Sequence, residues 1–150
     1  MASIRSVTDQ LRPSLLDDLG LLPALRALVA DFEGRTGIAV AFTAPEALPP
    51  VDTLAELAIF RAVQEGLSNV ARHADAATAT VALAARADGL TIRIEDDGRG
   101  LFADGATVEE HTGLAGMRER FTALRGTVTL APGATGGTRL TLHLPLAHEH

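Results

Sequence analysis

The sequence predicts an α/β protein, a two-layer α/β sandwich in which helices cover one face of a mixed sheet. The first observation is that apolar residues recur at helical spacing in some segments and alternate with polar residues in others. The second is the element order, α-α-β-α-β-β-loop-α-β-β, which lacks the regular βαβ alternation of a dinucleotide-binding fold. The third is size, since 150 residues, 47% of them hydrophobic, suit one domain with a substantial core.

The first two predicted elements are helices. Residues 4–12 have a helical pattern that ends before Pro13. The next helix begins near Pro23, which suits a first turn, and ends at Gly34 or Gly37. The apolar residues that recur along it are Leu25, Leu28, Val29 and Phe32.

A strand and the longest helix follow. The strand is expected at 38–42, and the proline-rich residues 44–50 connect it to the helix. Residues 52–73 carry a broad apolar face at helical spacing. Asp52 or Thr53 is the expected N-cap of this helix.

The second half of the chain predicts mainly strands. Two alternating runs, 78–86 and 90–95, flank the turn dipeptide Asp88-Gly89 and predict a hairpin. Residues 97–112 are rich in glycine and charge and predict a mobile loop. The apolar residues of a further helix are Leu114, Met117, Phe121 and Leu124. The last two strands are expected at 126–131 and 138–144.

Composition excludes several classes of function. A net charge of −6 and an aromatic content of 3% argue against a nucleic-acid partner, which would need a basic or stacking surface. The chain has no cysteine, which excludes disulfides and thiol catalysis. It also has no apolar run long enough to cross a membrane and no signal-peptide pattern. We therefore expect a cytoplasmic domain that makes no direct membrane contact.

Four short motifs carry the chemistry, and the first lies on the longest helix. Glu65, Asn69 and Arg72 or His73 are spaced at i, i+4 and i+7 or i+8, so they share one helical face. An asparagine oxygen can ligate Mg²⁺, a carboxylate can accept a proton, and a cation can meet phosphate. A solvated polar face is the alternative explanation of this motif.

The second motif follows the strand expected at 90–95. Asp96 precedes Gly98 and Gly100, an arrangement that lets the backbone approach a ligand while a carboxylate accepts a hydrogen bond. A carboxylate suits an exocyclic amine such as that of adenine. The same residue types also suit an ordinary turn.

The third and fourth motifs are glycine-rich. Gly113, Leu114, Gly116 and Met117 open a helix, and the N–H groups of a helix N-terminus can bind phosphate. Simple helix initiation explains this motif equally well. The fourth motif, Gly136-Gly137-Thr138, enters the last strand and is by itself mostly turn chemistry.

Taken in order, the four motifs resemble the ATPase family that includes DNA gyrase, the Hsp90 chaperones, histidine kinases and MutL, whose Bergerat-type fold is a two-layer sandwich. The resemblance implies that ATP and Mg²⁺ are the cofactors. It assigns Asn69 as the Mg²⁺ ligand, Glu65 as the acid/base or orienting residue, and Arg72 as a phosphate contact. Asp96 would bind the adenine amine. The remaining residues that match the family's nucleotide-binding motifs are His73, Gly98, Gly100, Gly113, Leu114, Gly116, Met117 and Thr138.

Three longer segments narrow the resemblance to the sensor histidine kinases related to the nitrate sensors and to DesK. They are LRPSLLDDLGLLPAL (11–25), QEGLSNVARHA (64–74) and GLAGMRER (113–120). In that group the first segment leads from the dimerisation helices into the ATPase domain. The implied division is residues 1–20 as the end of a dimerisation helix and linker, 21–146 as the ATP-binding domain, and 147–150 as a tail.

The sequence departs from these kinases at two positions. Arg72 stands where many relatives have lysine, which changes the geometry of a phosphate contact but keeps its charge. Gly66 stands inside the longest helix, where relatives more often have alanine. A glycine there indicates either close packing or a softened helix.

The resemblance implies that the domain transfers the γ-phosphoryl group of ATP to a histidine on a dimerisation domain outside this chain. None of the five histidines has the sequence context of such an acceptor. The full-length kinase, whose membrane attachment the sequence leaves open, would pass the phosphoryl group to a response regulator. Two alternatives remain open: an anti-sigma-factor-type serine kinase of the same superfamily, and an ATP-sensing interaction module without turnover.

Overall fold

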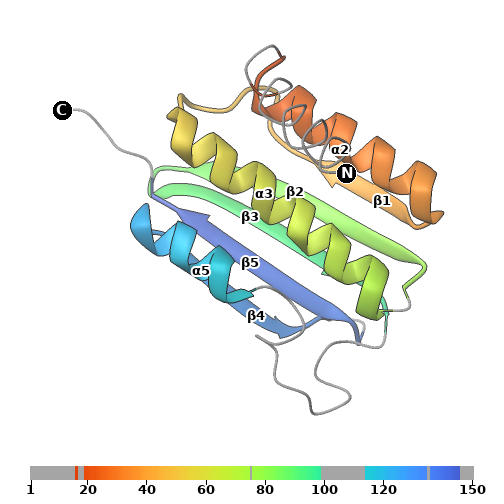
Figure 1. Ribbon diagram of the computed structural model, residues 1–150. Coiled ribbons are helices and arrows are strands. Elements are labelled where there is room, and N and C mark those ends of the chain that lie inside the picture. The colour runs from red at the N-terminus through yellow and green to blue at the C-terminus, as the bar shows by residue number, and fades with distance from the viewer. Residues whose placement is uncertain (1–15, 17–18, 75, 99–113, 135, 146–150) are drawn as a thin grey trace, which may run out of the picture.

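The computed structural model describes residues 16, 19–74, 76–98, 114–134 and 136–145, with the backbone alone at residues 73 and 74. Figure 1 shows these residues as two layers, a sheet and a layer of helices on one of its faces. The helices are α2 (Leu21–Thr36), α3 (Thr53–Asn69), the π-helical turn η1 (Val70–Ala74) and α5 (Leu114–Ala123). The strands are β1 (Ala39–Thr43), β2 (Thr78–Arg86), β3 (Gly89–Asp96), β4 (Thr127–Pro132) and β5 (Thr138–Leu144).

The sheet contains both parallel and antiparallel pairs. Its strand order is β1-β2-β3-β5-β4. The chain passes from β1 through α3 to β2, and these two strands are parallel, with Ala39 opposite Thr78. The other neighbours are antiparallel. The predicted two-layer sandwich with a mixed sheet is therefore confirmed, as is the hairpin of β2 and β3.

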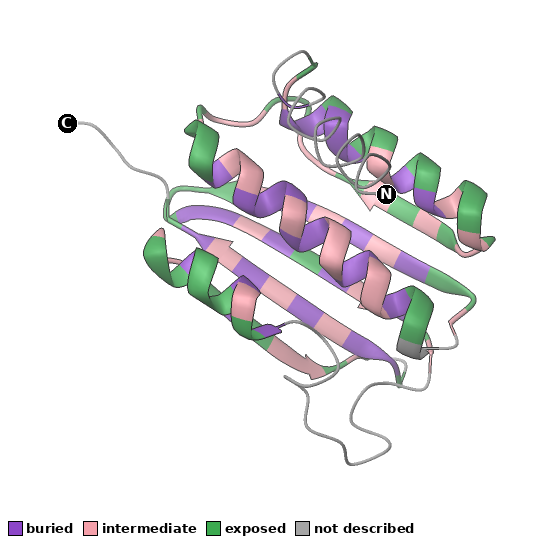
Figure 2. Ribbon diagram, in the orientation of Figure 1, coloured by how far each residue is buried: buried purple, intermediate pink, exposed green. Residues whose placement is uncertain are grey.

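The core lies between the sheet and the helices because the strands alternate as the sequence pattern predicts. Figure 2 shows that buried residues alternate with partly buried or exposed ones along β3 and β5. The core residues on these two strands are Leu90, Ile92, Ile94, Leu140, Leu142 and Leu144. Those on the helices include Leu25, Phe32, Ile59, Phe60, Val63, Leu67, Met117 and Phe121. Burial of such side chains stabilises the fold by about 1.5–3 kcal/mol each.

The expected helix ends are confirmed for α2 and for the start of α3. The Asp52 side chain accepts a hydrogen bond from the backbone N–H of Ala55 at 2.9 Å, which caps α3. Gly37 adopts the left-handed conformation that ends α2. The helix predicted over 4–12 and most of the loop predicted over 97–112 lie outside the described residues.

The prediction of one regular helix over 52–73 was wrong in its last turn, which is the π-helical turn η1. The backbone N–H of Val70 is shared between the carbonyl oxygens of Gly66 and Leu67, so the regular hydrogen-bond ladder loosens at this point. This turn carries Arg72 past the end of α3.

Candidate functional site

A cavity lies between the end of α3, the end of β3, the start of β5, the neighbouring strand β4 and the first turn of α5. Its empty space, counting the part open to solvent, is about 400 Å³. The lining is mainly apolar with a few polar groups. The residues that line it are Gly66, Asn69, Val70, Ile94, Asp96, Leu114, Met117, Leu130, Thr138 and Leu140.

Asp96 points into this cavity because it continues the buried face of β3. Among the described residues, the buried polar side chains are Asp96 and Thr138, which are 5% and 6% exposed. The Asp96 carboxylate accepts a hydrogen bond from the backbone N–H of Gly98 at 2.8 Å and another from the backbone N–H of Thr138. Burial raises the pKa of Asp96, and the two N–H donors oppose that rise.

Asp97, the next residue, has a structural task instead. Its side chain accepts hydrogen bonds from the backbone N–H groups of Ala77 and Thr78 at 3.0 Å and from the Thr78 hydroxyl at 2.8 Å. These bonds, first the backbone one from Thr78, lower the pKa of Asp97. The two neighbouring aspartates therefore have different roles: the Asp96 carboxylate lies in the cavity, and the Asp97 carboxylate binds the start of β2.

Gly137 makes the close approach between β5 and Asp96 possible. A Cβ atom added at Gly137 would overlap the backbone oxygen of Asp96 and come within 2.7 Å of its carbonyl carbon. Backbone atoms cannot move aside as a flexible side chain can, so only glycine fits at this position. Gly137 belongs to the motif Gly136-Gly137-Thr138 noted in the sequence. The role of Gly137 could not be read from that motif, because it depends on the pairing of β5 with β3.

The polar residues of the first motif are brought together at the other end of the cavity. The Arg72 guanidinium donates hydrogen bonds to Asn69 Oδ1 at 2.7 Å and to the Ser68 hydroxyl, and its Nη2 lies 3.6 Å from Glu65 Oε2. Asn69 lines the cavity, whereas Glu65 and Arg72 lie beside it. Their side chains are 33% and 49% exposed, so this end faces solvent.

Gly66 is explained by close packing of α3 on the sheet. An added Cβ would lie 2.7 Å from Ile94 Cδ1 and 3.4 Å from Leu140 Cδ2. The glycine therefore lets the helix lie near β3 and β5 and leaves space in the cavity wall. Of the two explanations left open by the sequence, the contact with Ile94 favours close packing.

The first turn of α5 forms the third wall of the cavity, through Leu114 and Met117. The helix is held on the sheet by Arg118, whose Nη1 donates to the carbonyl oxygen of Val128 at 2.8 Å. Among the described residues, an added Cβ at Gly116 would meet only Arg120 Nη1, at 3.8 Å, which leaves room for a side chain. Sterics therefore give no reason for a glycine at this position.

The structure thus brings five of the predicted residues into one cavity. They are Asn69, Asp96, Leu114, Met117 and Thr138. Gly98 contributes its backbone N–H to Asp96. Gly100, Gly113 and the side chain of His73 lie outside the described part of the chain. Sequence reasoning missed four apolar lining residues, because every amphipathic helix or strand contains such residues. They are Val70, Ile94, Leu130 and Leu140.

The Arg72 end of the cavity suits a magnesium ion that is bound by one protein oxygen and otherwise by the phosphates of a nucleotide and by water. The described residues contain no group of three histidine, cysteine, aspartate or glutamate side chains that could hold a metal. Mg²⁺ in nucleotide sites usually takes one or two protein oxygens and completes its shell with phosphate and water. Asn69 Oδ1 is such an oxygen and lies at the cavity wall, so the residues present fit this kind of binding.

Comparison with known sequences identifies the family. Residues 55–148 match the family described as histidine kinase-, DNA gyrase B- and HSP90-like ATPases, and the chain belongs to this family. The match covers all the residues of α3, η1, β3, α5, β4 and β5 that line the cavity.

Individual relatives point to one branch of that family. The chain is 35% identical over 149 residues to the signal transduction histidine-protein kinase/phosphatase DegS of Brevibacillus brevis, covering 99% of this chain and 38% of DegS. It is 36% identical over 144 residues to UhpB of Salmonella typhimurium, covering 95% of this chain and 28% of that kinase/phosphatase. The chain thus spans about a third of the length of these relatives.

Solved structures share the fold. The ATP binding domain of PrrB from Mycobacterium tuberculosis matches with a TM-score of 0.66 at 23% identity. The match covers 81% of this chain and 90% of the PrrB domain. Among the helices that the structure describes, none has the length and apolar character to cross a membrane.

Proposed function

We propose that this chain is the ATP-binding catalytic domain of a two-component sensor histidine kinase, and that it transfers the γ-phosphoryl group of ATP to a histidine on a dimerisation domain. The observation that carries the proposal is the buried carboxylate of Asp96, the one buried carboxylate among the described residues, in a mainly apolar cavity of this ATPase family. The intact kinase would then pass the phosphoryl group to a response regulator. The proposed division of the chain is residues 1–20, 21–146 and 147–150, as the sequence suggests.

The base would bind at the Asp96 end of the cavity. The Asp96 carboxylate accepts a hydrogen bond from the 6-amino group of adenine, and guanine presents a carbonyl at the same position. Ile94, Met117 and Leu140 pack on the base, and Thr138 contacts its edge. Gly98 and Gly100 let the backbone approach the nucleotide.

The phosphates would lie toward the Arg72 end. Arg72 and His73 contact phosphate, and Gly113, Leu114 and Gly116 bring the N-terminus of α5 to the phosphate chain. Asn69 Oδ1 would hold Mg²⁺, which when bound neutralises phosphate charge. Glu65 orients the incoming imidazole or accepts its proton. Positioning and charge neutralisation account for most of the acceleration of phosphoryl transfer.

The test uses this chain, radiolabelled ATP and a separate dimeric helical hairpin that carries an acceptor histidine. We expect the chain to bind ATP, to leave itself unlabelled, and to place acid-labile label on the hairpin weakly, because the effective concentration of a tethered acceptor is missing. Glu65→Gln should keep ATP binding and reduce the transfer. Label on a serine-bearing partner instead would indicate the serine kinase, and binding without any transfer would indicate a nucleotide sensor.

A further inference from the structure

The side chains of consecutive residues of β3 lie on opposite faces of the sheet. Asp96 lies on the buried face with Ile94, whose Cδ1 is close to Gly66 of α3. Because side chains alternate along a strand, Glu95 lies on the other face, away from the helices and the cavity. Its side chain is 21% exposed. Glu95 is therefore close to the base-binding carboxylate in sequence but separated from the nucleotide by the sheet.

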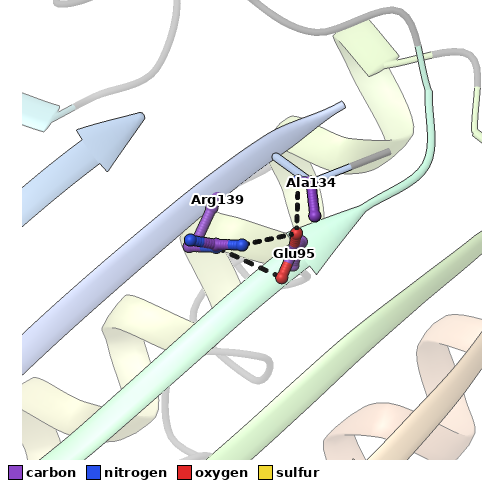
Figure 3. A network of polar contacts seen from close by, with 3 residues as sticks. All are labelled: Glu95, Ala134 and Arg139. Carbon is purple, nitrogen blue, oxygen red and sulfur yellow. Dashed lines mark hydrogen bonds and ion pairs between the residues drawn. The ribbon is translucent and has the colours of Figure 1, made fainter. Parts of the chain in front are cut away.

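Figure 3 shows that Glu95 binds the connection between β4 and β5. Glu95 Oε2 accepts a hydrogen bond from the backbone N–H of Ala134 at 2.9 Å. The guanidinium of Arg139, opposite Glu95 on β5, donates to both carboxylate oxygens at 3.3 Å. The hydrogen bond from Ala134 is the largest cause of the lowered pKa of Glu95, so this bond favours the ionised carboxylate.

The same connection reaches the buried face a few residues later. The backbone N–H of Gly133 donates to the carbonyl oxygen of Gly137 at 2.7 Å. Gly137 packs on the backbone of Asp96, and Thr138 donates its backbone N–H to the Asp96 carboxylate. The connection is thus bound on one face by Glu95 and on the other by Asp96.

We propose that Glu95 is a positioning residue for base recognition: by holding Ala134 on the outer face, it fixes Gly137 and Thr138, which orient the Asp96 carboxylate in the cavity. Arg139 supports Glu95 through the cross-strand ion pair. This inference rests on the proposed function, because it requires that Asp96 binds the adenine amine.

An ordinary surface ion pair would have a different consequence. A partly exposed pair such as Arg139 and Glu95 adds little to stability by itself. The hydrogen bond from Ala134 is different, since it connects Glu95 to a backbone segment that ends at the site. If the proposal holds, loss of Glu95 acts on the recognition of the base more than on the melting temperature.

The experiment compares binding of ATP and inosine triphosphate, which has a carbonyl in place of the 6-amino group, by calorimetry on the whole chain. In Glu95→Ala we expect the preference for ATP to fall by about threefold to tenfold, the size of the net contribution of one ordinary protein hydrogen bond. Arg139→Gln, which keeps the Ala134 contact, should lose less. Thr91→Val is the matched control: it removes the Thr91–His143 contact between the same two strands, far from the connection, and should keep the wild-type preference.

Three results would contradict the role proposed for Glu95 or for Asp96. An unchanged preference in both Glu95→Ala and Arg139→Gln overturns the proposal, as does an equal loss of affinity for both nucleotides. If Glu95→Ala fails to fold, the comparison of Arg139→Gln with Thr91→Val still decides, since only the first is expected to reduce the preference. A wild-type chain that binds both nucleotides equally would instead contradict the proposed base recognition by Asp96.

Discussion

The two ends of the cavity are held by different kinds of contact. At the Asp96 end, the carboxylate is buried and is bound by two backbone N–H groups, with Gly137 packed on its backbone. At the Arg72 end, the guanidinium contacts three other side chains beside solvent, those of Glu65, Ser68 and Asn69. Arg72 therefore binds the Asn69 oxygen that is proposed for the metal. The proposed function then implies that the Asp96 end keeps its contacts when nucleotide binds, whereas Arg72 must release Asn69 before that side chain can hold Mg²⁺.

The largest effect should come from closing the space at Gly137. Gly137→Ala forces a Cβ into the backbone of Asp96, and such overpacking costs about 1–3 kcal/mol or more. We expect ATP affinity to fall by about 100-fold, measured by calorimetry beside a thermal melt. Gly34→Ala is the control, since an added Cβ at Gly34 meets no atom of the described residues within 4 Å. Wild-type affinity in Gly137→Ala would show that the base end is adaptable.

Asp96→Asn should have the next largest effect. It replaces part of the acceptor for the adenine amine with a donor and should weaken ATP binding by about 1–3 kcal/mol. Affinity for inosine triphosphate should change less, because that nucleotide offers no amine. If calorimetry finds ATP affinity unaltered, Asp96 does not bind the base.

At the other end, Asn69→Ala should act through the metal and leave the base contacts intact. A magnesium titration should show that Mg²⁺ no longer strengthens ATP binding, while affinity without Mg²⁺ stays near wild type. The expected loss at saturating Mg²⁺ is about tenfold, or 1.4 kcal/mol. Retained magnesium coupling would place the metal ligand elsewhere.

The smallest effect is that of pH. Burial raises the pKa of Asp96, so its carboxylate takes up a proton at a higher pH than an ordinary aspartate. ATP affinity should therefore decrease as pH falls through that raised pKa, by a few-fold, and Asp96→Asn should lack this component. Without nucleotide, the free energy of unfolding should change with pH in the opposite direction. The raised pKa means that the folded chain binds a proton at Asp96 more tightly than the unfolded chain does, so this stabilising contribution is present at low pH and is lost as pH rises through the raised pKa. Calorimetry and melts of both proteins across mildly acidic pH measure the two slopes.

Periodicity predicted the elements because it reports directly which side chains are buried. The hairpin followed from Asp88-Gly89, and the cap of α3 from Asp52. The parallel pairing of β1 with β2 could not be predicted, since no local signal states which strands become neighbours. The π-helical turn after Asn69 was missed for a similar reason, because its residues are compatible with an ordinary helix.

The sequence predicted the polar residues of the candidate site but not the contacts that position them. The motifs named polar residues, and the alternation of Leu90, Ile92 and Ile94 could also have shown that Asp96, rather than Asp97, faces the core. The role of Gly137 depends on the approach of β5 to β3, and that of Glu95 on the position of Ala134. Both roles depend on contacts between residues that are far apart in the sequence, and the local pattern of one sequence does not reveal such contacts.

The parallel strand β1 affects how this domain can be dissected. The family match begins at residue 55, so a protein trimmed to that range would lose both α2 and β1. The backbone groups of Thr78–Ala82 that pair with β1 would then form an open edge on an alanine- and threonine-rich strand. Open edges of this kind promote pairing between molecules. A fragment that starts at residue 55 should therefore self-associate even though the cavity residues are all present.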